Sequence, residues 1–333
     1  MIPFASFVSD RVPPSAAESE ALEAICKQYG ADVFASTYYS TCAGTPSVQL
    51  VYDMIAEVMA YDLIHRDWQE KDIAMLYGRA HICISHQTRD DLLRFYPEIS
   101  PDRVTVAHCG IETDVFRPRP AAEVDMFRRV HDLSGSYLMV VGARMHEGGY
   151  KNGAHLVEAL SGMAPRKDLT VLFVGGEQEI PKIRMGGRKV EARRVVLSDD
   201  DLARAYCGAE ALVYPSLYEG FGMPVAEAMA CGCPVITTNL GSLAEVAGDA
   251  ALLVSGTDID EMRTALCAVR EPEVRARALV AGPERARAFR WDAMADHVAD
   301  RIEQLAEETR AGQHRAFLSE WAELRHLQSE VDF

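Results

Sequence analysis

Two carboxylates, Glu219 and Glu227, flank the start of an expected helix in the segment PSLYEGFGMPVAEAMACGCPVIT, which spans residues 215–237. A short apolar run before this segment is typical of a buried parallel strand, and strong helix formers follow the loop. The first backbone N–H groups of a helix have no partner within it, and such a helix end binds phosphate well. Carboxylates beside a phosphate site indicate a site for a phosphorylated ligand such as a nucleotide sugar.

The predicted helix begins at Pro224, a residue well suited to the first helical position, and Gly222 leaves the backbone before it open to a ligand. Glu219 would then lie in the loop, and Glu227 in the first or second turn of the helix. For Glu227 alone, a charge that interacts favourably with the helix dipole is an equally good explanation. The presence of both glutamates around the PSLYEGFG loop favours a ligand site.

A second glycine-rich loop, GARMHEGGYKNG at residues 142–153, connects a predicted strand to a predicted helix. Its backbone N–H groups could cradle phosphates, and it carries Arg144 and Lys151. The glycine spacing matches neither the P-loop nor the dinucleotide fingerprint, so an ordinary loop is the alternative. A planar Arg fork and a Lys point charge suit two neighbouring phosphates.

Residues 198–254, and more weakly the chain back to about residue 31, resemble the group 1 (family 4) glycosyltransferases. The family pattern E-x7-E is matched by Glu219 and Glu227 in spacing and context. The resemblance implies an α/β protein of the GT-B fold, with two Rossmann-like domains whose parallel sheets face a cleft. It also implies a retaining transfer of a sugar from a nucleotide-diphosphate sugar to a glycan or lipid-linked acceptor, in cell-surface polysaccharide synthesis.

The resemblance further implies roles for individual residues. Glu227 would hydrogen-bond the ribose hydroxyls, and Glu219 would contact hydroxyls of the donor sugar. Arg144 and Lys151 would bind the diphosphate. The other residues assigned to the donor lie in the loop after the strand or at the edge of the nucleobase pocket, namely Gly220, Phe221, Gly222, Met223 and Leu197. No cofactor is expected, because the nucleotide sugar is itself a substrate.

No metal is expected either. The SDDD segment at residues 198–201 superficially suggests a carboxylate metal site, but Ser198 followed by Asp201 predicts a capped helix start. Fixed cations can stabilise the negative charge of a departing nucleoside diphosphate without a metal. In the mechanism that the resemblance implies, the departing phosphate helps to take the acceptor proton, so no pair of catalytic carboxylates is needed.

Short β-rich runs alternate with helical patterns in the first third of the chain, so a parallel sheet is expected there as well. The predicted strands lie at residues 31–35, 48–52, 81–85 and 103–107, and the predicted helices at residues 16–29, 68–78 and 88–96. These pieces resemble the acceptor domain of the family. The opening strand and glycine-rich loop of that domain are not found, so we expect a reduced or incomplete first domain.

The VHD-like motif of many relatives corresponds here to Val51, Tyr52 and Asp53. Tyr52 could donate a hydrogen bond to the sugar but is not an equivalent base. Asp53 is the better candidate for a carboxylate facing the cleft, with turn formation at a strand end as the alternative. His86 and His108 are further candidates, although a single histidine near a strand end is more often structural.

Three regions are predicted: an acceptor-side domain at residues 1–118, a nucleotide-sugar-binding domain at 119–290, and C-terminal helices at 291–333. The run RPRPAAEV, which begins at Arg117, marks the link between the domains because its prolines interrupt both periodicities. The C-terminal helices would cross back onto the first domain or form a homodimer contact.

The composition fits this organisation. A chain of 333 residues with 48% hydrophobic residues can build two cores, and a formal charge of -16 argues against nucleic acid as a partner. No apolar run is long enough to cross a membrane and the first residues do not resemble a signal peptide, so a cytoplasmic protein is expected. The basic run at residues 184–194 leaves open a weak contact with lipid at the inner face of the membrane, although a solvated hairpin turn is favoured.

The eight cysteines are scattered without paired zinc spacing, so reduced thiols are expected. Alternative functions remain open at this stage. A nucleotide-sugar epimerase or a glycogen-synthase-like polymerase shares the GT-B plan, and a catalytically silent partner subunit would fit the reduced first domain. A dinucleotide-dependent oxidoreductase would need a GxGxxG after its first strand, which the sequence does not contain.

Overall fold

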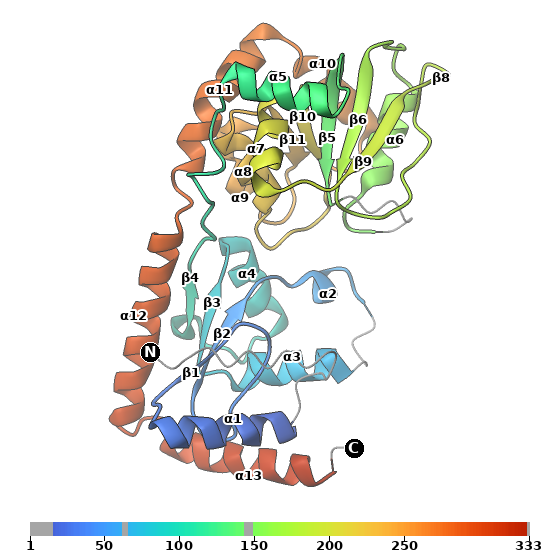
Figure 1. Ribbon diagram of the computed structural model, residues 1–333. Coiled ribbons are helices and arrows are strands. Elements are labelled where there is room, and N and C mark those ends of the chain that lie inside the picture. The colour runs from blue at the N-terminus through green and yellow to red at the C-terminus, as the bar shows by residue number, and fades with distance from the viewer. Residues whose placement is uncertain (1–15, 62–65, 143–148, 332–333) are drawn as a thin grey trace. The chain divides into compact units, whose positions relative to one another are not determined.

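The computed structural model describes residues 16–61, 66–142 and 149–331. The chain divides into two compact units, each with its own parallel sheet (Figure 1). Unit 1 is formed by residues 1–107 and 293–333, and unit 2 by residues 108–292. The chain therefore returns to unit 1 after it has completed unit 2.

The sheet of unit 1 has four parallel strands in the order β1-β2-β3-β4. They are β1 (Phe34–Ser36), β2 (Ser47–Val51), β3 (Ala80–Cys83) and β4 (Val104–Val106). The helices between and before them are α1 (Ala16–Tyr29), α2 (Ile55–Val58), α3 (Arg66–Tyr77) and α4 (His86–Phe95), with a 3-10 turn at Pro101–Arg103. Helix α4 begins at His86 because the side chain of Ser85 accepts a hydrogen bond from the N–H of Thr88, at 3.0 Å.

The C-terminal helices α12 (Trp291–Arg310) and α13 (Arg315–Val331) complete unit 1. Helix α13 packs against α1, and the fully buried Arg325 donates hydrogen bonds to Ser19 (2.8 Å) and Glu70 (3.0 Å). The ring of Trp321 stacks on Tyr77 with 4.4 Å between centroids. A buried guanidinium with both acceptor and carboxylate partners, together with this aromatic pair, fixes α13 to the core of unit 1.

The sheet of unit 2 has six parallel strands in the order β12-β11-β10-β5-β6-β9. They are β5 (Ser136–Val141), β6 (Leu169–Val174), β9 (Glu191–Val195), β10 (Ala211–Tyr214), β11 (Val235–Thr238) and β12 (Leu252–Val254). The chain adds strands outward from β5 in one direction and then outward from β10 in the other. The order of strands therefore reverses between the neighbours β5 and β10.

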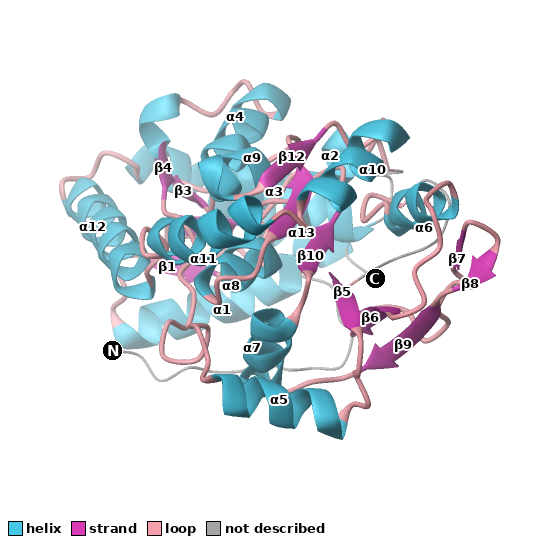
Figure 2. Cartoon of the chain, turned by 90° about the horizontal axis from the view of Figure 1, so that it is seen from above, coloured by secondary structure: helices cyan, strands magenta, loops and turns pink. Residues whose placement is uncertain are grey.

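Helices cover both faces of this sheet (Figure 2). On one face, α6 (Gly153–Ser161) packs against α10 (Ile259–Ala268) over a buried apolar core that includes Leu138, Val171 and Val213. The other face carries α5 (Ala121–Val130), α7 (Asp199–Gly208), α8 (Met223–Ala230), α9 (Leu243–Ala247) and α11 (Pro272–Ala286), with a 3-10 turn at Gly248–Ala250. The central strands β5, β6 and β10 are apolar and buried over most of their length, as a parallel sheet covered on both faces requires.

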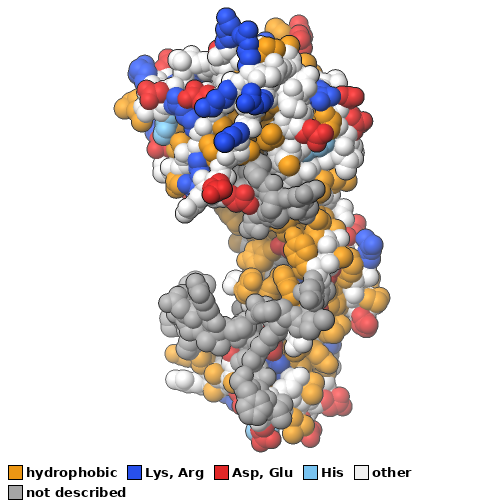
Figure 3. All heavy atoms as spheres, turned by 90° about the vertical axis from the view of Figure 1, so that its right-hand side faces the viewer, with side chains coloured by type: hydrophobic (Ala, Val, Ile, Leu, Met, Phe, Trp, Pro, Cys, Tyr) orange, Lys and Arg blue, Asp and Glu red, His pale blue; other side chains and the backbone are white. Residues whose placement is uncertain are grey.

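The structure confirms the strands and helices expected at the start of the chain, around both glycine-rich loops and in the basic run. That run forms an antiparallel hairpin of β7 (Arg184–Met185) and β8 (Arg188–Lys189). It lies on a side of unit 2 where several Lys and Arg side chains gather (Figure 3).

The expectation that the whole run RPRPAAEV forms a link is corrected, because its last four residues, 121–124, form the first turn of α5. Pro120 precedes that helix as its N-cap, a place where proline does not disturb helical hydrogen bonds. Within the described residues, no helix is both long and apolar enough to span a membrane.

Candidate functional site

The reversal of strand order between β5 and β10 places two loops side by side at the carboxyl end of the sheet of unit 2. In open α/β sheets, ligands bind at such a point, just beyond the carboxyl ends of the strands. One loop follows β5 and leads into α6, and the other follows β10 and leads into α8. These are the two glycine-rich loops that the sequence singles out.

Lys151 and Glu219 meet at this point, one from each loop. Lys151 Nζ donates to Glu219 Oε1 at 2.6 Å and to the hydroxyl of Tyr214 at 2.8 Å. The Tyr214 hydroxyl in turn lies 2.8 Å from the same carboxylate oxygen. Glu219 is only 8% exposed, so this ion pair is shielded from water and held by the last residue of β10.

The backbone around Glu219 is fixed by the turn that follows β11. Ser242 Oγ lies 2.9 Å from the carbonyl oxygens of both Glu219 and Phe221, to either of which it can donate. Gly241 adopts a φ of +56°, and a Cβ there would lie 3.1 Å from the backbone nitrogen of Glu219. A side chain at residue 241 would therefore push against the loop that carries the carboxylate.

Helix α8 begins directly after this loop. Gly222 is its N-cap with a φ of +98°, a conformation that favours glycine, and Met223 and Pro224 are its first residues. The cap of this helix makes no side-chain hydrogen bond. Pro224 has no N–H, and the N–H groups of Val225 and Ala226 donate to the carbonyl oxygen of Gly222 at 2.9 and 3.4 Å. Of the first four residues of α8, Met223 is therefore the one that can offer its N–H to an anionic ligand.

Glu227 lies one turn into α8. Burial raises its pKa to about 7; the charge of Asp199 also raises it, while a hydrogen bond from Tyr206 lowers it. The Tyr206 hydroxyl donates to Glu227 Oε2 at 3.2 Å, and burial together with that carboxylate raises the pKa of the tyrosine as well. A carboxyl group that changes protonation near neutral pH, at a helix start beside a ligand loop, is a candidate binding group.

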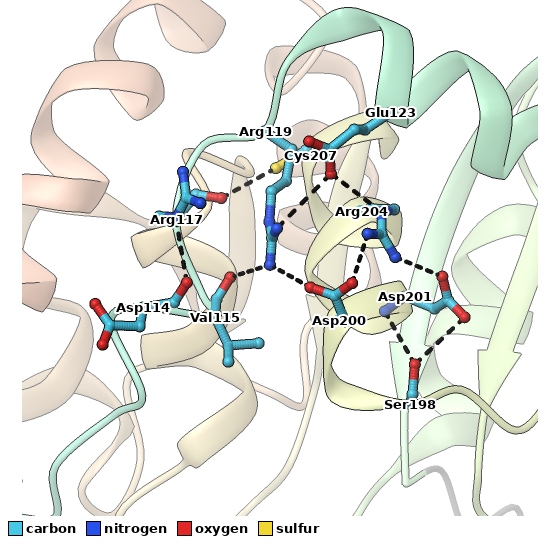
Figure 4. Close-up of polar contacts among 10 residues, drawn as sticks. All are labelled: Asp114, Val115, Arg117, Arg119, Glu123, Ser198, Asp200, Asp201, Arg204 and Cys207. Carbon is cyan, nitrogen blue, oxygen red and sulfur yellow. Dashed lines mark hydrogen bonds and ion pairs between the residues drawn. The ribbon is translucent and has the colours of Figure 1, made fainter.

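Two aspartates of the SDDD segment form ion pairs with arginines of the same unit (Figure 4). Ser198 Oγ accepts from the N–H of Asp201 at 3.3 Å, which confirms the predicted helix cap. Asp200 pairs with Arg119 at 2.7 Å and with Arg204 at 2.5 Å, and Asp201 pairs with Arg204 at 2.9 Å. These carboxylates join α7 to the start of unit 2, and their charge is compensated within the protein.

The remaining candidates lie apart from this pair or outside the described residues. Arg144 lies outside them. Leu197 is half-buried just beyond β9, at the same carboxyl end of the sheet. His108 belongs to unit 2, where its Nε2 lies 2.5 Å from Glu245 Oε1. Gly220 and Phe221 lie between Glu219 and α8, and Phe221 packs edge-on against Phe289.

Tyr52, Asp53 and His86 belong to unit 1. Asp53 follows β2, and its Oδ1 accepts a hydrogen bond from the N–H of Ile55 at 2.9 Å. This contact is the strand-end turn that was the alternative explanation for Asp53.

Three residues of the site were not singled out from the sequence: Tyr214, Tyr206 and Ser242. Tyr214 had a usable signal, because an aromatic residue with a hydroxyl ends an otherwise apolar central strand. Tyr206 and Ser242 contact the glutamates from segments 21 and 23 residues away in the chain. The spacing within one motif does not reveal such contacts.

Comparison with known proteins gives a consistent picture. Residues 135–272 match the family described as "Glycosyl transferases group 1". Among curated relatives, O-antigen chain mannosyltransferase B of Escherichia coli is 28% identical over 220 residues, which cover 63% of this chain and 57% of that protein. Alpha-maltose-1-phosphate synthase of Mycolicibacterium smegmatis is 32% identical over 241 residues, covering 67% of this chain and 59% of the relative. The chain thus spans little more than half the length of these relatives.

Solved structures share the fold over more of the chain. Sucrose-phosphate synthase from Thermosynechococcus elongatus has a TM-score of 0.67 at 23% identity, covering 86% of this chain and 77% of that one. The structure of Anabaena HepE in complex with UDP-glucose has a TM-score of 0.61 at 17% identity, covering 80% of this chain and 72% of that one. These similarities confirm the predicted fold class, an α/β protein of the GT-B type with two parallel sheets.

Proposed function

The chain belongs to the group 1 glycosyl transferases, which it matches through residues 135–272, and we propose that it transfers a hexosyl group from a nucleotide-diphosphate sugar to a glycan or lipid-linked acceptor with retention of configuration. One observation carries this proposal. The Lys151–Glu219 pair lies at the strand-order reversal of unit 2, beside the start of α8, where Met223 can offer its N–H. A cation and an N–H donor suit a diphosphate, and a carboxylate suits the hydroxyls of the sugar linked to it.

Within this proposal, the nucleotide sugar is held by unit 2. The N–H of Met223 at the start of α8, Lys151 and Arg144 bind the diphosphate, and Glu227 binds the ribose hydroxyls. Leu197 borders the nucleobase, and the backbone of Gly220 to Met223 lines the sugar and phosphates. Lys151 has three N–H donors, so it can bond a phosphate oxygen and keep a contact with Glu219.

Glu219 then orients hydroxyls of the donor sugar. The bond from the anomeric carbon to the diphosphate oxygen breaks as the bond to the acceptor oxygen forms on the same face of the sugar. The acceptor proton passes to an oxygen of the departing diphosphate, whose growing negative charge Lys151, Arg144 and the helix start stabilise. Atoms and charge balance without a metal or a protein base.

Unit 1 would supply the acceptor side, with Asp53 and Tyr52 as the candidates there. The name of the Escherichia coli relative, an O-antigen chain mannosyltransferase, supports an acceptor in cell-surface polysaccharide synthesis and a mannosyl donor. A lipid-linked acceptor would place the reaction at a membrane surface, for which we propose the cytoplasmic face. The homodimer that the sequence leaves open is not needed by this site.

Turnover of nucleotide sugars tests the proposal. The full chain is incubated separately with UDP-glucose, GDP-mannose, ADP-glucose and dTDP-glucose, and release of the nucleoside diphosphate is followed with and without a membrane glycolipid extract as acceptor. We expect release with one donor, a rate lower by about tenfold to a hundredfold in Lys151→Ala, and an unchanged rate in Lys167→Ala, an exposed lysine of the same unit. Binding of a donor without turnover would favour the silent partner subunit, and no binding of any donor would contradict the proposed site.

A further inference from the structure

Unit 2 has a recess at the amino ends of its strands, opposite the end of the sheet that carries the proposed donor site. It has a volume of about 410 Å³ and is lined by Arg128, Ser136, Arg166, Asp168, Gly208, Ala209, Glu210, Arg270 and Arg275. Ser136 begins β5, Asp168 immediately precedes β6 and Glu210 immediately precedes β10, so the recess lies at the amino ends of these strands. Arg128 comes from α5 and Arg275 from α11, whereas Arg166 follows α6 and Arg270 follows α10. Helices α5, α10 and α11 lie near the top of unit 2 in Figure 1.

The recess is separate from the proposed donor site. Strand β5 has six residues, and a strand rises by about 3.3 Å per residue, so about 20 Å of sheet separates its two ends. Lys151 and Glu219 lie beyond the carboxyl ends. Neither lines the recess.

Two of its four arginines have clear structural roles. Arg166 forms a two-pronged ion pair with Glu210, each nitrogen lying 2.7 Å from one carboxylate oxygen. Arg128 donates to the carbonyl oxygens of Gly208 (3.3 Å) and Gly135 (2.6 Å). These contacts satisfy both oxygens of Glu210 and hold the rim of the recess in place.

Arg270 and Arg275 are not explained in this way. Arg275 donates through Nη1 to the backbone carbonyl of Glu210 at 2.8 Å, so its charge is not compensated by that contact. Arg270 is exposed at the end of α10. Among the residues that line the recess, four are positive and two are negative, and one of the negative pair, Glu210, is already engaged by Arg166. A concave site with excess positive charge stands out in a chain whose formal charge is -16.

We propose that this recess binds the phosphate group of a small phosphorylated molecule, with Arg270 and Arg275 as the principal contacts and Arg128 and Arg166 as the positive wall behind them. Guanidinium groups match the geometry of phosphate oxygens, and several of them around one recess favour a doubly charged anion. The concave shape suits a small molecule that enters the recess. The site would bind its ligand independently of the nucleotide sugar.

Calorimetry on the full chain tests this. Inorganic phosphate, pyrophosphate and glucose 6-phosphate are titrated separately into protein saturated with a nucleoside diphosphate, so that the donor site is filled. We compare wild type with Arg270→Ala/Arg275→Ala, with Lys151→Ala, and with Arg287→Ala/Arg315→Ala, which removes the same charge from exposed positions outside the recess. Thermal melting checks that each variant is folded.

We expect at least one of the three probes to bind wild type, the Lys151→Ala variant and the control double variant alike. Loss of two charge-assisted contacts should weaken binding in Arg270→Ala/Arg275→Ala by at least about a hundredfold. Tightest binding of glucose 6-phosphate would identify a phosphorylated sugar as the ligand, and equal binding of all three would identify the phosphate group alone. No binding of any probe, binding that the nucleoside diphosphate or Lys151→Ala abolishes, or an equal loss in both double variants would overturn the proposal. Failure here leaves the donor-site assay untouched, since the two sites share no residue.

Discussion

Replacing Glu227 by glutamine should make the protein more stable at high pH. Burial holds the pKa of Glu227 at about 7, above its ordinary value of 4.5, so the folded state binds more protons than the unfolded state between these two values. The free energy of unfolding therefore falls as the pH rises through this window, and the loss is complete above about pH 7. Glutamine has no proton to lose, so Glu227→Gln removes this loss.

The size of the effect follows from the same two values. The difference between about 7 and 4.5 corresponds to about 3 kcal/mol in the free energy of unfolding. Relative to wild type, Glu227→Gln should therefore gain about 3 kcal/mol between pH 4.5 and pH 8. For a unit of this size the gain corresponds to roughly 6–12 °C in melting temperature. Any fixed packing cost of the amide cancels, because each variant is compared with itself across pH.

Urea unfolding and calorimetry at several pH values measure this gain. Glu158→Gln, an exposed position in α6 of the same unit, removes one carboxylate and serves as the control. Tyr206→Phe gives a second arm, because it removes the hydrogen bond that lowers the pKa of Glu227 in the folded state. The upper end of the pH window should then rise. Parallel pH profiles for wild type and Glu227→Gln would refute the reasoning, since Glu227 would then ionise alike in the folded and unfolded states.

Three further predictions concern the donor site. Each charged hydrogen bond to a diphosphate is worth roughly 1.5–3 kcal/mol, so Lys151→Ala should lower donor turnover by about tenfold to a hundredfold. Glu219→Gln should lower turnover with the nucleotide still bound. Near-normal steady-state kinetics in Lys151→Ala would contradict the phosphate assignment. A chelator such as EDTA should leave the rate unchanged, and a loss restored by magnesium or manganese would return the SDDD segment to consideration as a ligand site. A fragment of residues 108–292, the whole of unit 2, should fold and bind the nucleoside diphosphate in calorimetry but transfer no sugar. A well-folded fragment that binds no nucleotide would mean that the donor site needs residues of unit 1.

The local structure around both loops could be predicted from the sequence because short-range chemistry decides it. Ser198 caps α7 from three residues away, and Gly222 and Pro224 begin α8 as their backbone preferences require. The prolines of RPRPAAEV led us to predict a link through residue 124, where the structure has the start of helix α5. Proline interrupts a helix from within but is tolerated at its start, and the sequence pattern does not distinguish these two places at Pro120.

The contacts between the loops could not be predicted in the same way. Lys151 and Glu219 are 68 residues apart, and their pairing depends on β5 and β10 being neighbours in the sheet. No short pattern encodes that adjacency. It follows from the strand order of the whole unit, which the sequence expresses only through the packing of buried faces.

The Lys151–Glu219 pair also explains why the site can hold charged groups with little water around them. A buried cation or carboxylate alone would be costly, but the two compensate each other, and Tyr214 contributes a hydroxyl to both. Under the proposed function, an arriving diphosphate would not need to create a positive site, because Lys151 is already positioned by Glu219 and Tyr214. The apolar strands of unit 2 thus position the two side chains in a site from which water is largely excluded.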